Sequence, residues 1–141
     1  MTHKYIGTKI VTAWSSEKDG LPGYGVKYED GYTSWSPKEV FESAYRDIEG
    51  PVQALNFGDA IHMLKTGKKV TRAGWNGKGM FVFLVDGSTF AVSRKPLLGI
   101  YPEGQIVEYH AHIDMKTADD KIVPWLASQT DVLAEDWALV A

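Results

Sequence analysis

Cysteine is absent from this sequence of 141 residues. Its absence excludes disulfide bonds, a cysteine nucleophile and thiolate-bound zinc or iron–sulfur clusters. Long apolar runs are also missing, because the longest, Met80–Val85, is far too short to cross a membrane. The opening residues, MTHKYIGTKIV, contain no long apolar stretch and no small-residue cleavage site. We therefore expect neither a signal peptide nor a membrane partner.

A surplus of basic residues is missing as well, since the formal net charge is −3. Proteins that bind DNA or RNA nonspecifically usually present a basic face, so we expect no nucleic-acid polymer as a partner. Glycine and tryptophan, in contrast, are plentiful, with 14 and 5 residues. The glycines indicate many tight turns, and the indoles indicate either a Trp-rich core or a stacking pocket.

Residues 1–50 are predicted to form a small N-terminal β-β-α module. Lys4–Ala13 and Tyr24–Glu29 have strand composition, and Tyr32–Trp35 is a short third strand. Ser36-Pro37-Lys38-Glu39 has the pattern of a capping box with proline at the first helical position. The helix that it predicts extends to about Arg46, and residues 47–51 are interpreted as a linker.

Residues 52–141 are predicted to form the main domain. Asn56 is a candidate N-cap for an amphipathic helix that ends near Gly67. A strand is expected to begin at Val70. Residues 80–92 are predicted to form a β-hairpin that turns at Asp86-Gly87.

Two further strands and a final one complete the expected main domain. The alternation of apolar and polar residues over Gln105–Thr117 predicts one half-buried strand with a polar face. Ile122–Leu126 and Trp137–Val140 are also expected to be strands, with a loop or short helix over Ala127–Glu135. The predicted fold class is α+β: an antiparallel sheet packed with one or two helices, together with the N-terminal module.

The glycine-rich segment Gly74–Gly79 is one candidate for ligand binding. Its glycines let a ligand approach the backbone, and exposed amides can hold phosphate oxygens. Lys78 adds a positive charge, Trp75 a stacking surface and Asn76 both a donor and an acceptor. The alternative interpretation is a tight turn with Trp75 as an anchor in the core.

The segment Pro124–Asp131 is a second candidate. Trp125 is followed by four consecutive polar residues, Ser128-Gln129-Thr130-Asp131, which offer mixed donors and acceptors. Such a run could recognise a purine edge, a ribose diol and phosphate oxygens. The alternative is the start of a helix, with Ser128 or Thr130 as its cap.

His110, His112 and Asp114 alternate along one predicted strand and therefore share a face. They could bind a divalent ion, but no fourth ligand is identifiable, so we expect no metal and no cofactor. A catalytic triad is not supported either, because the GxSxG elbow is absent. We therefore expect no enzymatic activity.

Four segments together resemble the second family of Thoeris anti-defence proteins: Asn56–Ala60, Thr71–Phe81, His112–Asp119 and Trp125–Trp137. The resemblance extends from Asn56 to the C-terminus. Residues 1–50 lie outside it and are similar to a short module of other small phage proteins. Members of the family are phage-encoded sponges for cyclic ADP-ribose isomers made by TIR-domain immune enzymes, and some also take cyclic dinucleotides.

The resemblance implies a phage anti-defence protein that sequesters a cyclic nucleotide signal in the cytoplasm of the infected host. It also implies a homo-oligomer, most simply a tetramer, with ligand pockets between subunits. Gly77, Gly79, Lys78 and Arg72 could then meet phosphates. A signal-degrading enzyme and a phage structural or interaction protein remain the alternatives. The expected ligand-binding residues are Trp75, Asn76, Lys78, Phe81, Asp114, Trp125, Ser128, Gln129, Thr130 and Asp131.

Overall fold

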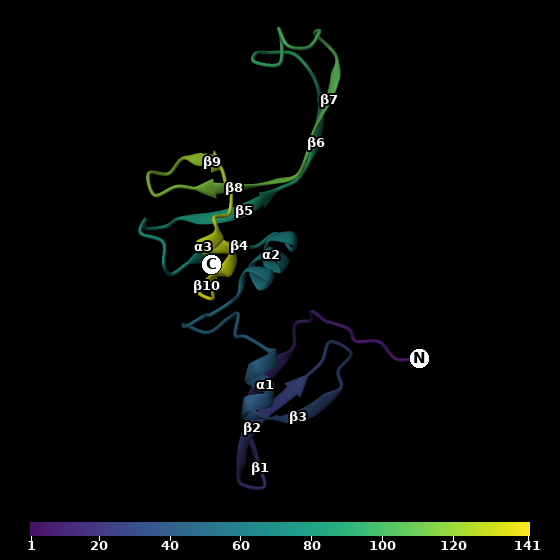
Figure 1. The fold of residues 1–141 in the computed structure, drawn as a ribbon, viewed down its shortest axis with the longest axis vertical. Helices are drawn as coiled ribbons and strands as arrows, with labels where there is room; N and C mark the ends of the chain where they lie inside the picture. Colours follow the sequence, from purple (N-terminus) through teal and green to yellow (C-terminus); the bar gives the residue numbers. More distant parts are fainter. The chain divides into compact units, whose positions relative to one another are not determined.

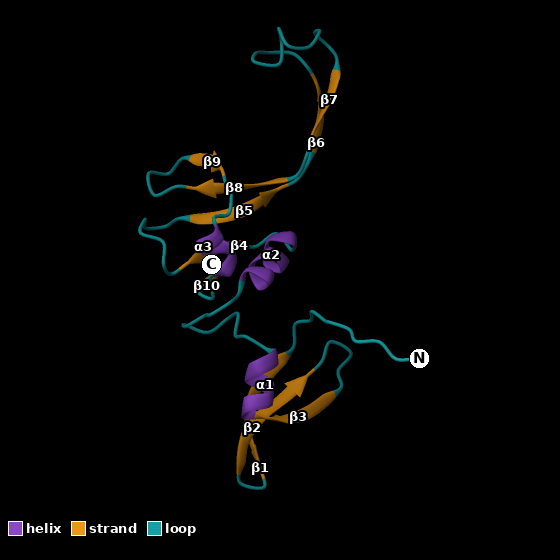
Figure 2. Ribbon diagram, viewed as in Figure 1, coloured by secondary structure: helices purple, strands orange, loops and turns teal.

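The computed structural model describes all 141 residues, and the chain divides into two compact units, Met1–Arg46 and Asp47–Ala141. Figure 1 labels the elements along the chain, and Figure 2 shows that strands predominate over three short helices. The α+β class is therefore confirmed. None of the helices is long and apolar enough to span a membrane.

The N-terminal unit is a three-stranded antiparallel sheet with a helix on one face. Its elements are β1 (Thr12–Lys18), β2 (Leu21–Lys27), β3 (Thr33–Pro37) and α1 (Lys38–Ala44), and the strand order is β1-β2-β3. The helix packs through Phe41, whose ring stacks on Tyr24 of β2 with 4.3 Å between ring centroids. The third strand is a full member of the sheet, which makes this unit β-β-β-α.

The strand predicted over Lys4–Ala13 is wrong. Residues 1–11 form no strand, and β1 begins at Thr12. The turn decides the register: Asp19 and Gly20 both have positive φ, 53° and 77°, as a two-residue primed hairpin turn requires. This turn pairs Thr12–Lys18 with Leu21–Lys27. Strand composition describes fit to a pleated surface and cannot itself supply a partner.

The capping box predicted at the start of α1 is also wrong. Ser36 lies within β3, where it pairs with Tyr24. The N-cap is Pro37, and no side chain caps the helix. Ser36 is therefore part of the sheet and does not cap α1.

The C-terminal unit contains a five-stranded antiparallel sheet in the order β10-β4-β5-β8-β9 and a separate two-stranded ribbon, β6-β7. Its elements are α2 (Phe57–Lys65), β4 (Lys69–Arg72), β5 (Phe81–Val85), β6 (Ser88–Ala91), β7 (Ile106–Tyr109), β8 (His112–Lys116), β9 (Ile122–Pro124), α3 (Gln129–Leu133) and β10 (Trp137–Val140).

Helix α2 begins as its sequence predicts. The Asn56 side chain accepts the Asp59 N–H at 2.8 Å, and the Asp59 carboxylate accepts the Asn56 N–H at 3.0 Å. One face of the helix then covers the sheet. The buried core that forms there consists of Leu55, Ala60, Met63, Leu64, Val70, Val82 and Trp137.

The hairpin predicted over residues 80–92 is wrong, because β5 and β6 do not pair with each other. Strand β5 pairs with β8, and β6 pairs with β7. Asp86-Gly87 marks a break in pairing instead of a chain reversal. A Cβ at Gly87 would lie 2.9 Å from the Tyr109 carbonyl oxygen, so the glycine allows the two chains to pass closely.

The single strand predicted over Gln105–Thr117 is likewise broken into β7 and β8. Its register does not shift at the break: Val85 pairs with His112, and Ser88 with Tyr109, three residues further along each chain. The alternating pattern is thus explained by one long hairpin that leaves the sheet and continues as a ribbon. Figure 1 shows this ribbon extending away from the rest of its unit.

Candidate functional site

The expected ligand-binding residues lie in three places within the C-terminal unit. Trp75, Trp125, Ser128 and Asp131 belong to a cluster beside the core. Asn76 and Lys78 are exposed in the glycine-rich loop that follows β4, and Gln129 and Thr130 are exposed on α3. Phe81 and Asp114 lie on the sheet face that α2 does not cover.

The indole cluster consists of Trp75, Trp125 and Trp137. All three pairs of rings meet edge to face, with centroids 5.4 to 6.2 Å apart. Trp137 is fully buried and donates its indole N–H to the Asp131 carbonyl at 3.0 Å. Trp75 and Trp125 are partly buried and pack against the core. The three indole rings thus pack against one another and cover the core.

Arg72, at the end of β4, connects this cluster to two carboxylates. Its Nη1 lies 2.8 Å from Asp131 Oδ1, and its Nε lies 2.8 Å from Asp136 Oδ1. Asp131 Oδ1 also accepts the Trp75 indole N–H at 3.0 Å, and Asp136 Oδ2 accepts the Gly74 N–H at 2.7 Å. We call these groups the Arg72 network: Arg72, Trp75, Asp131 and Asp136.

The network shifts the pKa of each of its charged members. The bonds from Asp136 and Asp131 raise the pKa of Arg72, and the Arg72 bond lowers the pKa of Asp136 despite partial burial. Burial raises the pKa of Asp131, but hydrogen bonds from Trp75, Arg72 and Ser128 outweigh burial, and its pKa is lowered overall. All three groups are therefore charged at neutral pH.

These shifts predict loss of stability in acid. A carboxylate whose pKa is lower in the folded protein stabilises the fold above its ordinary pKa, here 3.8, and that contribution disappears as the pH falls through the folded value. The urea midpoint should therefore fall between about pH 5 and about pH 2. Asp136→Asn should flatten this dependence. A midpoint that falls equally in wild type and variant would contradict the role of the network.

Ser128 and Asp131 form the capping box of α3. The Ser128 hydroxyl oxygen accepts the Asp131 N–H at 3.1 Å, and the Asp131 carboxylate accepts the Ser128 N–H at 3.2 Å. Asp131 is buried at 8 % exposure, and its hydrogen bonds to Arg72, Trp75 and Ser128 account for both of its oxygens. The helix-start interpretation thus describes these two residues, whereas Gln129 and Thr130 extend to the surface.

The loop 74–79 extends from the Arg72 network to the turn between β8 and β9. At one end Gly74 bonds to Asp136, and at the other the Lys116 ammonium donates to the Gly79 carbonyl at 3.2 Å. A Cβ at Gly77 would overlap Met80 and crowd Ala118, so the loop lies close against its neighbours. The loop is thus held at both ends while Asn76 and Lys78 remain exposed.

Phe81 and Asp114 lie on neighbouring strands of the open sheet face. Phe81 pairs with Lys116, and Phe83 with Asp114, so the four side chains share one face. The Lys69 ammonium lies 5.0 Å from the centroid of the Phe81 ring. This face offers two phenyl rings beside two lysines and one carboxylate.

The two histidines do not combine with Asp114 into a metal site. His112 Nε2 lies 3.4 Å from Asp114 Oδ2, but its Nδ1 lies 3.0 Å from the His110 carbonyl oxygen. His110 itself falls in the break between β7 and β8. No group of three His, Cys, Asp or Glu residues placed to hold a metal ion occurs in the chain.

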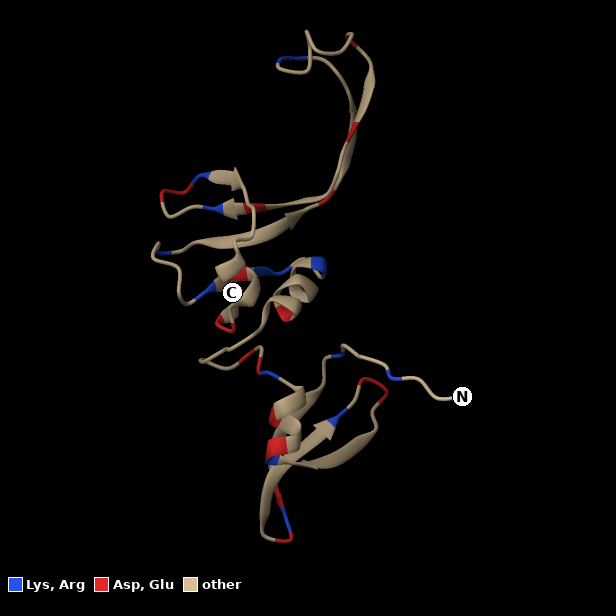
Figure 3. Ribbon diagram, in the orientation of Figure 1, with Lys and Arg blue, Asp and Glu red and all other residues tan.

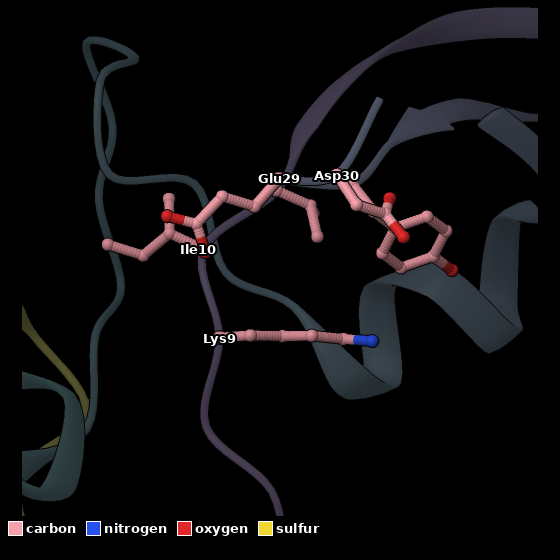
Figure 4. A pocket seen from close by; sticks show the side chains of 6 residues that line it. Lys9, Ile10, Glu29 and Asp30 are labelled. Carbon is pink, nitrogen blue, oxygen red and sulfur yellow. The ribbon is translucent and has the colours of Figure 1, made fainter. Parts of the chain in front are cut away.

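A hollow of about 510 Å³ lies in the N-terminal unit, lined by Lys9, Ile10, Val11, Tyr28, Glu29 and Asp30. Figure 4 shows the Lys9 side chain extended beside the ring of a neighbouring residue. Its ammonium lies 4.4 Å from the Tyr28 ring centroid. With Glu29 and Asp30 on the wall, this hollow is poorly suited to a phosphate.

The candidate site is therefore the surface around loop 74–79. It combines the exposed side chains of Asn76 and Lys78 with those of Gln129 and Thr130, because the Trp75–Asp131 bond holds the loop against α3. Lys116 and Asp136, which anchor the two ends of the loop, were not identified from the sequence. Both lie in segments that carry the family resemblance, but only the fold brings their side chains to the loop.

Comparison with known proteins shows a family match for the C-terminal unit. The family model of the Thoeris anti-defense 2-like domain matches residues 55–140. The protein Thoeris anti-defense 2 of Bacillus phage SP01 is 45% identical over 87 residues, which cover 62% of this chain and 96% of that protein. The matched residues contain the indole cluster, the Arg72 network and loop 74–79.

Proposed function

This chain belongs to the Thoeris anti-defense 2-like family, and on that premise we propose that it binds and sequesters a cyclic ADP-ribose-type immune signal without degrading it. Cyclic dinucleotides are the second ligand class of this proposal. The protein would act in the cytoplasm of an infected bacterium. The observation that carries the proposal is the match to nearly the whole length of the phage relative at 45% identity.

The surface around loop 74–79 fits such a ligand chemically. Lys78 is exposed on the loop and offers a positive charge to a pyrophosphate. Gln129 and Thr130 offer donors and acceptors to ribose hydroxyls. Ser128, Asp131 and Arg72 are already bonded to one another or to the loop, so they serve as the support of the site.

Tight binding requires enclosure, and the ribbon suggests how enclosure arises. A nanomolar dissociation constant corresponds to about −12 kcal/mol, which exposed side chains on one surface do not supply. Isolated two-stranded ribbons are marginally stable, yet β6-β7 exposes Phe90, Ile106 and Tyr109 at 39, 63 and 48 %. We propose that these apolar residues contact other copies of the chain in a homo-oligomer, most simply a tetramer.

Holding the ligand, as opposed to converting it, agrees with the chemistry of the site. The Ser128 hydroxyl oxygen accepts a helix N–H in place of meeting a base, and His112 is directed to Asp114. Ground-state binding of great strength also opposes turnover, since a catalyst must bind the transition state better than the substrate.

Native mass spectrometry against cyclic ADP-ribose isomers and cyclic dinucleotides tests both parts of the proposal. We expect an oligomer, with a tetramer favoured, and a mass shift equal to an intact cyclic ADP-ribose isomer. A monomer that binds no member of the panel would contradict the proposal and favour a structural or interaction role. A monomer that still binds the ligand would contradict the assembly alone.

A further inference from the structure

Two indoles of the N-terminal unit lie flat across its central strand. Trp14 of β1 and Trp35 of β3 both pair with Gly25 of β2. A Cβ added at Gly25 would overlap the Trp14 ring, and one added at Gly23 would overlap the Trp35 ring. The rings therefore occupy the space that the two glycines leave free.

Trp35 crosses the whole sheet in this way. Its indole N–H donates to the Ser16 carbonyl of β1 at 3.1 Å, so the ring extends from β3 over β2 to β1. Trp14 extends from β1 over β2. The two indoles thus lie on the same face of the sheet, over Gly25 and Gly23 of β2, and we call this surface the indole face.

Within the N-terminal unit, the Lys18 ammonium lies 5.8 Å from the centroid of the Trp35 ring on this surface. Helix α1 lies on the opposite face, where Phe41 stacks on Tyr24. Trp14 remains 47 % exposed, a large value for the most hydrophobic class of side chain. The Trp14 part of the indole face is therefore accessible within this unit, and Lys18 is already placed beside the aromatic surface.

The charge on the indole face has one sign. Side chains alternate along a strand, so every second residue of β1, β2 and β3 shares this face. Its charged members are Lys18 and Lys27. Lys18 ends β1 beside the β1–β2 turn, and Lys27 lies at the far end of β2. Figure 3 shows acidic positions in the turns of this unit and on α1. Glu17 of β1 pairs with Pro22, so its side chain lies on the other face of the sheet. The other members are Thr12, Trp14, Ser16, Leu21, Gly23, Gly25, Thr33, Trp35 and Pro37.

We propose that the indole face binds single-stranded nucleic acid, with bases stacked on Trp14 and Trp35 and phosphates held by Lys18 and Lys27. Stacking on aromatic side chains beside basic groups is the general mode of sequence-tolerant strand binding. An open, wall-less surface suits an extended strand that uses both rings, whereas a single nucleotide needs an enclosing pocket. The net charge of −3 predicted no such partner, but that value averages over a face that is locally cationic.

The proposal does not depend on the function of the C-terminal unit, because residues 12–37 lie outside the family match at 55–140. Its alternative is purely structural: the indoles would only cover the sheet. The two differ in salt dependence. Two lysine–phosphate contacts should give a slope of about −1.4 for log affinity against log salt, and loss of one lysine should reduce the slope by about 0.7.

Fluorescence anisotropy of the full chain with labelled oligo(dT) of about ten nucleotides provides the test. Trp14→Ala should weaken binding at least about fivefold, equivalent to about 1 kcal/mol, and Trp14→Phe should retain most of it. Lys27→Ala should reduce the salt slope even where Trp14→Ala disturbs the fold. Lys38→Ala, at an exposed position on α1, should leave binding unchanged.

Three outcomes would overturn the proposal. The first is the absence of binding at low salt. The second is a loss in Lys38→Ala as large as that in Lys27→Ala. The third is displacement of the oligonucleotide by thymidine monophosphate as readily as by unlabelled oligo(dT), because a single nucleotide would then account for the contact.

Discussion

Arg72→Met should lower the free energy of unfolding of the C-terminal unit by about 3 kcal/mol. Removing one partner from a buried ion pair typically costs 3–5 kcal/mol, and partial exposure of Asp136 at 32 % places this case at about the lower end. The variant leaves both the Asp131 and the Asp136 carboxylates without their shared cation. Urea unfolding followed by indole fluorescence and circular dichroism measures the change.

A matched control distinguishes this loss from the removal of any cation. Lys68→Met, at an exposed position before β4, should change the free energy of unfolding by no more than about 0.5 kcal/mol. Adding Asp131→Asn and Asp136→Asn to Arg72→Met should recover part of the loss, because the like charges are gone. Equal stability of the Arg72 and Lys68 variants would show that the network contributes nothing to the fold.

Lys78→Ala should lower the affinity for the cyclic nucleotide at least tenfold, which is about 1.4 kcal/mol. Lys78 is exposed on a loop whose two ends are anchored by hydrogen bonds. The loop therefore holds the position of this residue, and the side chain does not contribute to the core. The loss should come with little change in the urea midpoint. Isothermal titration calorimetry with the ligand identified by native mass spectrometry measures it.

Lys68→Ala is the control for that measurement, because it removes an exposed lysine near the opposite end of β4 from loop 74–79. It should bind the ligand with wild-type affinity. Unchanged affinity in Lys78→Ala would mean that the phosphate is held elsewhere, and the open face with Phe81 and Lys116 would become the next candidate.

Local sequence predicted the elements whose signals are complete within a few residues. The start of α2 needed only Asn56 and Asp59, which cap each other. The strand Trp137–Val140 was also predicted with its observed bounds. In both cases the deciding residues are adjacent in the chain, and no distant partner competes for them.

Pairing of strands was predicted less well, because register depends on distant partners. Asp86-Gly87 has the composition of a hairpin turn, yet the chain continues through it and pairs with residues 106–116. Similarly, Lys4–Ala13 has strand composition but no partner, since the Asp19-Gly20 turn assigns Leu21–Lys27 to Thr12–Lys18. Composition alone could not distinguish these outcomes.

The candidate site was likewise predicted in part: its segments were identified, but the contact between them was not. The sequence identified loop 74–79 and the α3 segment as neighbours in function, but not the Trp75–Asp131 bond that joins them. It treated Trp75 and Asp131 as ligand contacts, whereas each is also a structural partner of the other. Their direct part in binding stays a prediction, and variants of either residue will affect stability as well as affinity.

The central claim, sequestration without turnover, is tested most directly by following the free ligand. The cyclic ADP-ribose isomer identified by native mass spectrometry is incubated with substoichiometric protein, and free ligand is measured by chromatography over time. We expect depletion in proportion to the protein added, then no further loss, and full recovery of the intact cyclic ligand after heat denaturation. A linear or smaller product that increases with time would contradict the account and show that the protein is an enzyme.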